Sequence, residues 1–317
     1  MKAIVLYSGG LDSTLALKLI KEQGAEVFPL FIRHQFLPES HLPKLKNLKT
    51  IDVTEEMIEI VKSPHYGYGK NLNPCIDCRI LMLQKAKRYL TELKADFVVT
   101  GEVLDQRPMS QRMEILMLIE KKAGLEGLVV RPLSGGLLPP TIPEKKGLID
   151  RGKLLKLRGR SRRIELALAK EKNIKEFFSP GGGCLLTDTG FSRRLADLMR
   201  YEGEITPEDI HLLKLGRHFR LGPNTRLVVG REEEENKKLE KLLNSKAVLL
   251  YVPNTGSPNA LLLGSRDLLK TAARVIARYS DKRKESIVEV CYKEKGKINK
   301  VKVQPCTDEE LNKWRVT

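Results

Sequence analysis

The sequence predicts an α/β protein, with an N-terminal parallel-sheet domain and a small C-terminal α/β domain. Three observations support this fold class. Residues 1 to about 135 alternate between strand-like and helical patterns, which is typical of a parallel sheet covered on both faces. A glycine-rich turn separates the first expected strand from the first expected helix. From about residue 216 the pattern changes to short strands and strongly amphipathic helices.

Each N-terminal element is placed by the period of its apolar residues. The expected strands lie at 3–7, 26–33, 49–53, 96–101 and 127–131. The expected helices lie at 12–23, 54–62, 77–94 and 110–123. Ligands of such sheets bind beyond the carboxyl ends of the strands, and Ser8, Arg33 and Gly101 fall at these ends.

The rest of the chain divides into two further parts. Glycine and proline pairs in residues 134–160 predict an extended crossing segment rather than a compact unit. Helices are expected near 161–172, 191–202 and 206–214, then at about 232–244 and 268–279, and strands at 227–229, 247–252, 286–292 and 298–303. We therefore expect domains at 1–135, 136–215 (a basic extension packed on the first) and 216–317.

Charge and composition restrict the class of protein. A chain of 317 residues is expected to form two or three domains. Its net charge of +17 suggests a polyanionic partner, although solubilising charge is the alternative. Residues 144–175 hold twelve Lys and Arg against four Asp and Glu, and this clustering favours a nucleic acid.

The sequence also predicts a cellular location. No apolar run reaches the roughly 18 residues of a membrane span. The N-terminus enters the first strand directly, which leaves no room for a signal peptide. We therefore expect a cytoplasmic protein without a membrane partner.

The turn after the first strand has the features of an anion site. Its residues are Ser8, Gly9, Gly10, Leu11, Asp12 and Ser13. Glycines let the backbone approach a phosphate, and the helix start directs N–H groups and a favourable dipole toward it. The turn matches neither a Walker A loop nor a Rossmann fingerprint. An ordinary strand-to-helix turn with small residues is the alternative.

Three cysteines have informative positions. Cys75 and Cys78 begin a predicted helix, where the thiol pKa should fall, and Cys184 follows three glycines. A thioredoxin-like redox pair is disfavoured by the preceding loop. A four-ligand zinc site lacks a second pair, because Cys291 and Cys306 lie in the other domain. Three cysteines on an iron–sulfur cluster would leave one iron open.

The Ser8–Ser13 stretch resembles the pyrophosphate loop of the PP-loop ATP pyrophosphatases, whose domain has the adenine nucleotide alpha hydrolase-like fold. The resemblance, which extends over residues 1 to about 215, implies that ATP is split between its α and β phosphates. An oxygen is adenylated in that reaction, and a nitrogen or sulfur nucleophile then displaces AMP. All six loop residues are implied to bind the nucleotide.

A second resemblance concerns the cysteines. The segment from Asn73 to Cys78 is similar to the catalytic stretch of 2-thiouridylases, although Cys75 replaces the usual aspartate. The three-cysteine pattern resembles cluster-dependent tRNA thiolases, which implies Cys75, Cys78 and Cys184 as ligands of a 4Fe–4S cluster. The open iron is implied to carry a hydrosulfide. Alternatively, Cys78 is the nucleophile, Cys184 carries a persulfide and Cys75 is incidental.

The same resemblance implies roles for residues at other strand ends. Gly101 would contact ATP, and Phe31 and Arg33 would meet adenine and ribose. Arg107 or Arg112 would meet phosphate charge; the alternative is that these arginines are solvated charges at the start of a helix. Asp12 would orient Mg²⁺ or the adenylated oxygen, or else cap the helix. The histidines lack ligand spacing, Cys291 has the pattern of a core residue, and Cys306 is expected to be incidental.

Together these features predict an ATP-dependent tRNA thiouridylase, a sulfurtransferase with Asp12, Cys78 and Cys184 as catalytic residues. It would use ATP, Mg²⁺ and a 4Fe–4S cluster, and tRNA with a sulfide or persulfide donor as partners. A homodimer is compatible with this prediction. The alternatives are an amidating ligase with a zinc site and a non-enzymatic, ATP-responsive RNA-binding factor.

Overall fold

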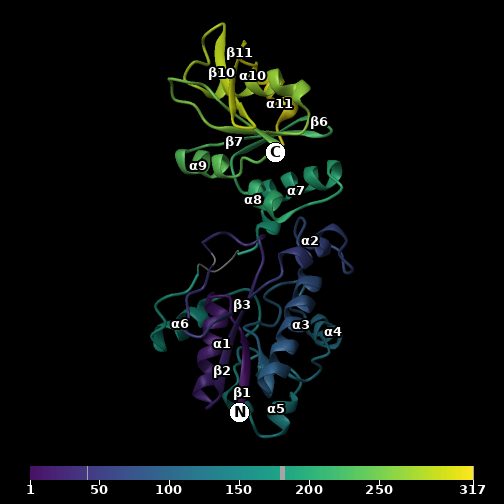
Figure 1. The fold of residues 1–317 in the computed structure, drawn as a ribbon. Helices are drawn as coiled ribbons and strands as arrows, with labels where there is room; N and C mark the ends of the chain where they lie inside the picture. Colours follow the sequence, from purple (N-terminus) through teal and green to yellow (C-terminus); the bar gives the residue numbers. More distant parts are fainter. Residues whose placement is uncertain (41, 179–182, 317) are drawn as a thin grey trace. The chain divides into compact units, whose positions relative to one another are not determined.

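The structure is a computed structural model that describes residues 1–40, 42–178 and 183–316 (Figure 1). It forms two compact units, Met1–Thr187 and Asp188–Thr317, which are described separately. The predicted extension 136–215 is shared between them, with residues 136–187 in the first unit. The predicted three-domain boundaries stay a prediction.

The first unit is built on a five-stranded sheet in the order β3-β2-β1-β4-β5. Every neighbouring pair is parallel, which confirms the predicted fold class. The strands are β1 (Lys2–Leu6), β2 (Glu26–Arg33), β3 (Lys49–Asp52), β4 (Phe97–Val99) and β5 (Val129–Val130). The carboxyl ends of β1, β2 and β4 therefore lie together at one edge of the sheet.

Helices cover both faces of this sheet. They are α1 (Leu11–Glu22), α2 (Thr54–Lys62), α3 (Cys75–Leu93), α4 (Met113–Ala123), α5 (Ile142–Lys145) and α6 (Arg163–Glu171). Figure 1 shows α1 and α6 on one side of the sheet, and α3 and α4 on the other. Both faces of β1 are consequently covered, and Ala3, Ile4 and Val5 are fully buried.

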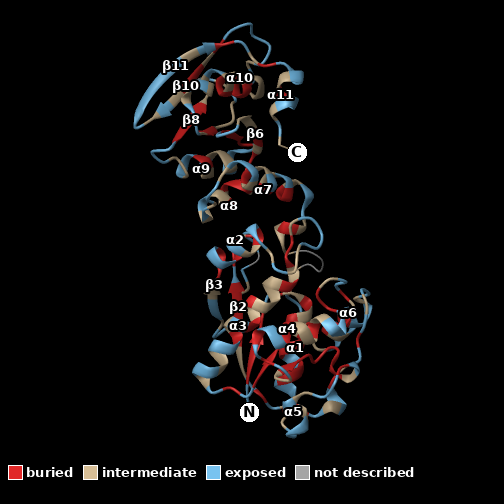
Figure 2. Ribbon diagram, turned by 90° about the vertical axis from the view of Figure 1, so that its right-hand side faces the viewer, coloured by how far each residue is buried: buried red, intermediate tan, exposed pale blue. Residues whose placement is uncertain are grey.

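The helices form because each has an apolar face to bury. Leu15, Ala16 and Ile20 of α1 are fully buried, and Ala16 and Ile20 pack with residues of β1 and β4. Figure 2 shows the buried residues concentrated in the strands and the inner helix faces. This packing fixes the position of the α1 start at the end of β1.

The segment 134–160 is less extended than its glycines and prolines predict. It contains the 3₁₀ turns η1 (Gly135–Leu137) and η2 (Arg151–Lys153) as well as α5. A capping box between Thr141 and Glu144 begins α5. Ile149 and Leu154 are buried in the core cluster of the sheet, so the segment is part of the first unit.

The second unit contains a six-stranded sheet in the order β11-β10-β8-β9-β7-β6. All its pairs are antiparallel. Its strands are β6 (Arg217–Gly222), β7 (Thr225–Val229), β8 (Ala247–Tyr251), β9 (Ala260–Leu263), β10 (Val288–Glu294) and β11 (Lys297–Val303). Of these, β6 and β9 were not expected from the sequence.

The second unit also contains helices, and the 3₁₀ turn η3 (Leu185–Thr187) precedes them at the end of the first unit. The helices are α7 (Thr189–Tyr201), α8 (Pro207–Leu213), α9 (Glu233–Lys241), η4 (Arg266–Leu268), α10 (Leu269–Tyr279) and α11 (Asp308–Trp314). Cys291 is buried as predicted, and Cys306 is also buried, in the core of this unit. Of the helices described, none has the length and apolar character needed to cross a membrane.

Candidate active site

The Ser8–Ser13 loop connects β1 to α1 and is held by its own hydrogen bonds. Gly9 has a φ of +74°, a left-handed conformation that favours glycine. The Ser8 N–H donates to Ser13 Oγ at 3.3 Å, and Ser13 Oγ donates to the Gly10 carbonyl at 3.0 Å. The start of α1, whose first N–H groups lack helical partners, therefore faces the cavity in a fixed conformation.

Gly101 supports this loop from the end of β4. A Cβ atom at Gly101 would lie 2.6 Å from the Asp12 carbonyl carbon and oxygen and 2.7 Å from the Ser13 nitrogen. Only glycine therefore allows the two backbones to pack this closely. Gly101 lines the cavity, and its direct contact is with the helix start; the predicted contact with ATP stays a prediction.

Asp12 forms an ion pair rather than a helix cap. The N-cap of α1 is Gly10, without a side-chain cap hydrogen bond, so the capping alternative is wrong. Asp12 Oδ2 lies 3.5 Å from Arg162 Nη2, and its Oδ1 is buried without a hydrogen-bond partner. Arg162 precedes α6 and lines the cavity. No role was expected for Arg162 from the sequence, although it lies within the predicted basic segment.

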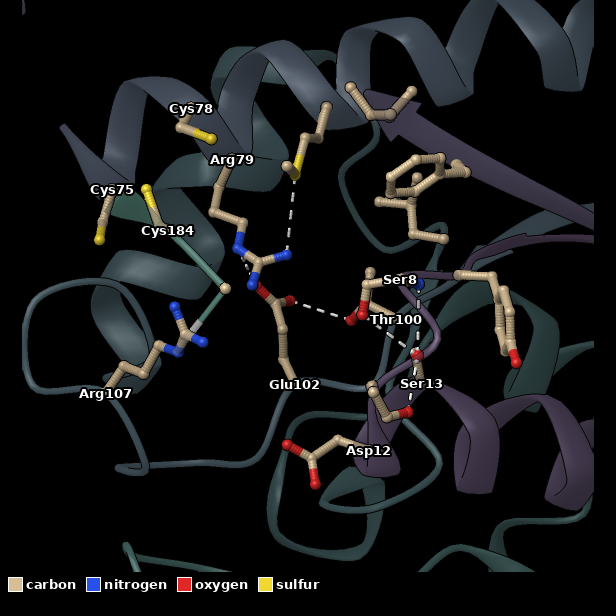
Figure 3. Close-up of a pocket in the computed structure, with 18 of the residues that line it drawn as sticks. Ser8, Asp12, Ser13, Cys75, Cys78, Arg79, Thr100, Glu102, Arg107 and Cys184 are labelled. Atoms are coloured by element: carbon tan, nitrogen blue, oxygen red, sulfur yellow. Dashed lines mark hydrogen bonds and ion pairs between the residues drawn. The ribbon is translucent and has the colours of Figure 1, made fainter. Parts of the chain in front are cut away.

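The three cysteines line the same cavity as the loop. Cys75 and Cys78 are in the first turn of α3, and Cys184 comes from a distant segment (Figure 3). The cavity has a volume of about 230 Å³. The glycine-rich stretch before Cys184 falls largely on residues 179–182, which lie outside the described residues.

The thiols are less acidic than their place on a helix predicts. Burial raises the pKa of Cys75, against the effect of Arg107 and Arg79. Burial also raises the pKa of Cys78 to about 11 and that of Cys184 to about 12. The predicted lowering at the helix start is therefore wrong, because loss of hydration outweighs the helix dipole.

A metal or cluster would need these thiols as thiolates. Three cysteines on one cavity, with cationic Arg79 and Arg107 nearby, are a suitable donor set for a three-cysteine iron–sulfur cluster. In the part of the chain that the structure describes, no three His, Cys, Asp or Glu side chains are already grouped to hold a metal ion. The donors fit by their chemistry, whereas their present arrangement is not a closed site.

A buried charge network lies between the loop and the cysteines. Glu102 Oε2 accepts hydrogen bonds from Thr100 Oγ1 at 2.9 Å and from Arg131 Nε at 3.0 Å. Arg131 also pairs with Glu120. Burial favours neutral Glu102, but Arg131, Arg79 and the hydrogen bonds outweigh it, so the pKa of Glu102 lies below its ordinary value. The sequence did not indicate this network, since its members come from separate elements.

The other predicted residues divide into two groups. Phe31 and Arg107 line the cavity. Arg33 is absent from the described lining and pairs with Asp52 at 3.6 Å on the exposed side of β2. Its position does not support the predicted ribose contact. Arg112 is the exposed N-cap residue of α4 and is also outside the described lining.

His34 was given no chemistry by the sequence, yet it lies in the cavity wall and is buried. It follows Arg33 directly at the end of β2. A polar residue that directly follows an expected strand of a parallel sheet is a sequence signal that could have identified it.

Comparisons with known proteins match the two parts of the chain to different families. Residues 1–136 match the family model described as thiamine biosynthesis protein (ThiI). Residues 216–315 match the model described as NFACT protein RNA binding domain. Residues 1–136 thus form a PP-loop-like domain that is similar to the ThiI family.

Curated relatives cover the N-terminal part. A probable tRNA sulfurtransferase of Thermococcus kodakarensis is 29% identical over 42% of this chain and 37% of its own. The tRNA-specific 2-thiouridylase MnmA of Sulfurimonas denitrificans is 32% identical over 32% of this chain and 35% of its own. The chain thus spans little more than a third of the length of either relative.

One solved structure is the complex of a 4-thiouridine synthetase with RNA and bound ATP. It is 25% identical, with a TM-score of 0.35 over 42% of this chain and 37% of that chain. A TM-score of this size does not establish a common fold.

Proposed function

We propose that this protein is an ATP-dependent tRNA sulfurtransferase that replaces a uridine oxygen with sulfur. The observation that carries the proposal is one cavity lined by both the Ser8–Ser13 loop and three cysteines. The loop suits activation of an oxygen by ATP, and the thiols suit delivery of sulfur. The similarity of residues 1–136 to ThiI agrees with this pairing.

In the activation step, the loop residues bind the pyrophosphate part of ATP, and Phe31 packs against adenine. The uridine oxygen attacks the α-phosphorus, forming a new O–P bond. The bond from the α-phosphorus to the bridging oxygen breaks, and pyrophosphate leaves with the electron pair. Asp12, beside the loop, would help to hold Mg²⁺. Catalysis then rests on positioning and on charge stabilisation by fixed donors.

In the displacement step, sulfur reaches the activated carbon from the cysteine end. Hydrosulfide attacks the carbon that bears the adenylated oxygen, so a C–S bond forms and the C–O bond breaks. AMP leaves with that oxygen, and the proton on sulfur is released to solvent. The products are thiouridine and AMP.

We further propose that Cys75, Cys78 and Cys184 hold a 4Fe–4S cluster. When bound, the cluster supplies an iron that can bind sulfur. Arg79 and Arg107 favour the thiolate forms that such binding requires. Sulfide is the expected donor, or else a persulfide compound together with a thiol reductant that releases its outer sulfur as hydrosulfide.

The RNA partner is inferred from charge and from the second unit. The basic residues of 144–175 would contact tRNA phosphates, and Arg162 brings part of that segment to the cavity. The family match of residues 216–315 supports RNA binding by the second unit. Such binding should weaken steeply with salt, because counterions are released from the RNA.

The test uses the full chain with ATP, Mg²⁺, sulfide and unmodified tRNA, with iron loaded anaerobically. We expect pyrophosphate release and a thiouridine, identified by mass spectrometry of nucleosides from the tRNA. Bound iron and acid-labile sulfide test the cluster. A product with nitrogen in place of oxygen, or a zinc-only protein, would favour an amidating ligase. Nucleotide binding without pyrophosphate release would favour a non-enzymatic RNA-binding factor.

A further inference from the structure

Arg79 occupies the middle of the candidate active site. It follows Cys78 in the first turns of α3, and its guanidinium extends into the space between the cysteines and the Ser8 loop (Figure 3). The side chain is 26% exposed, compared with 68% for the surface residue Arg158. It also lines the cavity. Arg79 is therefore a cation placed between the two ends of the site.

Glu102 accounts for this orientation. Its Oε1 lies 3.7 Å from Arg79 Nε, while its Oε2 accepts the hydrogen bonds from Thr100 and Arg131. Only 4% of the Glu102 side chain is exposed. A carboxylate held on one oxygen by a buried arginine has little freedom to move, so the other oxygen marks a fixed position for Arg79.

The charges of the network also require Arg79. Two carboxylates, Glu102 and Glu120, face the single buried guanidinium of Arg131. Arg79 supplies the second positive charge, so these four groups sum to zero. Of the four, Glu102, Glu120 and Arg131 are buried, and the guanidinium of Arg79 is the positive group that reaches the cavity. An anion entering the cavity can share Arg79 with Glu102.

We propose that Arg79 binds the α-phosphate of the nucleotide through the displacement step, and that Glu102 is the positioning residue that holds Arg79 for this contact. The inference rests on the proposed function. If the pyrophosphate part lies at the loop and sulfur comes from the cysteines, the α-phosphate must lie between them. Arg79 is placed in that interval.

The other cations of the cavity have different positions. Arg162 pairs with Asp12 at the loop, where the β and γ phosphates are expected. Arg107 lies beside the thiols in Figure 3 and contributes to the pKa of all three cysteines. Arg79 differs from both because a buried carboxylate orients it. A guanidinium can donate two parallel hydrogen bonds to a phosphate, and its positive charge stabilises the negative charge that AMP gains as it leaves.

The test compares two probes, AMP and inorganic pyrophosphate, by calorimetric titration of the full-length protein. We expect Arg79→Gln to lower the affinity for AMP about ten- to hundredfold, as for loss of a charged hydrogen bond. Affinity for pyrophosphate should change less than about twofold. The matched control is Arg88→Gln, the same substitution at an exposed position of α3, which should change neither.

Glu102 is tested by a double-mutant cycle. Glu102→Gln should lower AMP affinity in the wild-type background but not in the Arg79→Gln background, since it acts through Arg79. Thermal unfolding confirms that each variant is folded. If Glu102→Gln fails to fold, Arg79→Gln still decides the phosphate contact, because Arg79 is partly exposed.

Three results would overturn the inference. They are unchanged AMP affinity in Arg79→Gln, an equal loss for AMP and pyrophosphate, and an effect of Glu102→Gln that persists without Arg79. In each case wild-type protein that binds ATP and makes thiouridine leaves the proposed function intact. Wild-type protein that binds neither AMP nor ATP would overturn both.

Discussion

At the loop end of the cavity the backbone is already fixed, whereas at the cysteine end the ligand groups are not yet in their reactive form. Ser8, Gly10 and Ser13 are joined by hydrogen bonds, and Gly101 packs directly behind them. The cysteines come from two separate segments, and burial raises the pKa of all three thiols. The loop end can therefore bind an anion without rearranging its backbone, whereas the cysteine end holds neutral thiols at neutral pH.

This difference has a chemical consequence. A phosphate needs donors and positive potential, which a helix start and glycine loop supply from the backbone alone. A thiolate needs a nearby cation to offset its burial, and a bound metal or cluster can provide it. We therefore expect nucleotide binding to be independent of the cysteines, while sulfur transfer requires that they be loaded first.

The largest effect should come from the cysteines. Cys78→Ala should lower thiouridine formation by at least about a thousandfold, as for loss of a residue essential to the chemical step. ATP affinity should stay near the wild-type value, because the loop is intact. Single-turnover product analysis and nucleotide titration measure the two quantities. If the three cysteines hold a cluster, Cys75→Ala and Cys184→Ala should lower thiouridine formation as much as Cys78→Ala does.

A persulfide mechanism gives a different pattern, in which Cys75→Ala retains most activity. Cys291→Ala is the control, since Cys291 lies in the core of the second unit, and it should leave both quantities unchanged. A comparable loss of ATP affinity in Cys78→Ala would show that the two ends are not independent.

The next effect should come from Gly101→Ala. The new methyl group would meet the backbone of Asp12 and Ser13 at 2.6–2.7 Å, and backbone cannot move aside as a flexible side chain can. We expect a loss of about 2 kcal/mol in unfolding free energy, with weaker nucleotide binding. Circular dichroism is the suitable probe, because the single tryptophan, Trp314, lies in the other unit.

Gly203→Ala is the matched control for this substitution. A Cβ at Gly203 meets no atom within 4 Å, so its stability should change by less than about 0.5 kcal/mol. If Gly101→Ala were as stable as Gly203→Ala and bound ATP normally, the loop would be far less rigid than its contacts indicate.

A smaller, pH-dependent effect should come from Glu102, which lies between the two ends. Its pKa is lower in the folded protein than in the unfolded chain, where the ordinary value is 4.5. Its contribution to stability is therefore present above pH 4.5 and is lost as the pH falls through the folded-state pKa. The difference in unfolding free energy between wild type and Glu102→Gln should shrink below pH 4.5. A difference that grows on acidification would contradict this assignment.

The sequence predicted the elements of the first unit well because their signals are local. The expected strand 3–7 and helix 77–94 correspond to β1 and α3 within two residues at each end. The strand is a continuous apolar run, and the helix has a long apolar stripe at helical spacing. By contrast, β9 has four residues and β6 contains charged ones, so neither gave a recognisable period.

The site was predictable only where a motif is contiguous. The Ser8–Ser13 loop is such a motif, whereas the joining of Cys184 to Cys75 and Cys78 came from resemblance to a family. The network of Arg79, Glu102 and Arg131 joins three elements, and no local pattern reveals such a contact. The predicted lowering of the thiol pKa was wrong because burial raises it more than the helix start lowers it. Burial depends on the tertiary fold, which no local pattern reveals.

Substitution of Arg33 should have the smallest effect on ATP affinity, and it tests how far the nucleotide site extends at the loop end. It is the last residue of β2 and is paired in register with Asp52 of β3, which draws its side chain toward the exposed strand edge. A pair exposed to this degree contributes about 0–1 kcal/mol. Arg33→Gln should therefore change ATP affinity by less than about twofold in calorimetric titration. A tenfold loss would instead place Arg33 on the ribose, as the family resemblance implies, and would extend the nucleotide site beyond the cavity wall formed by Phe31 and His34.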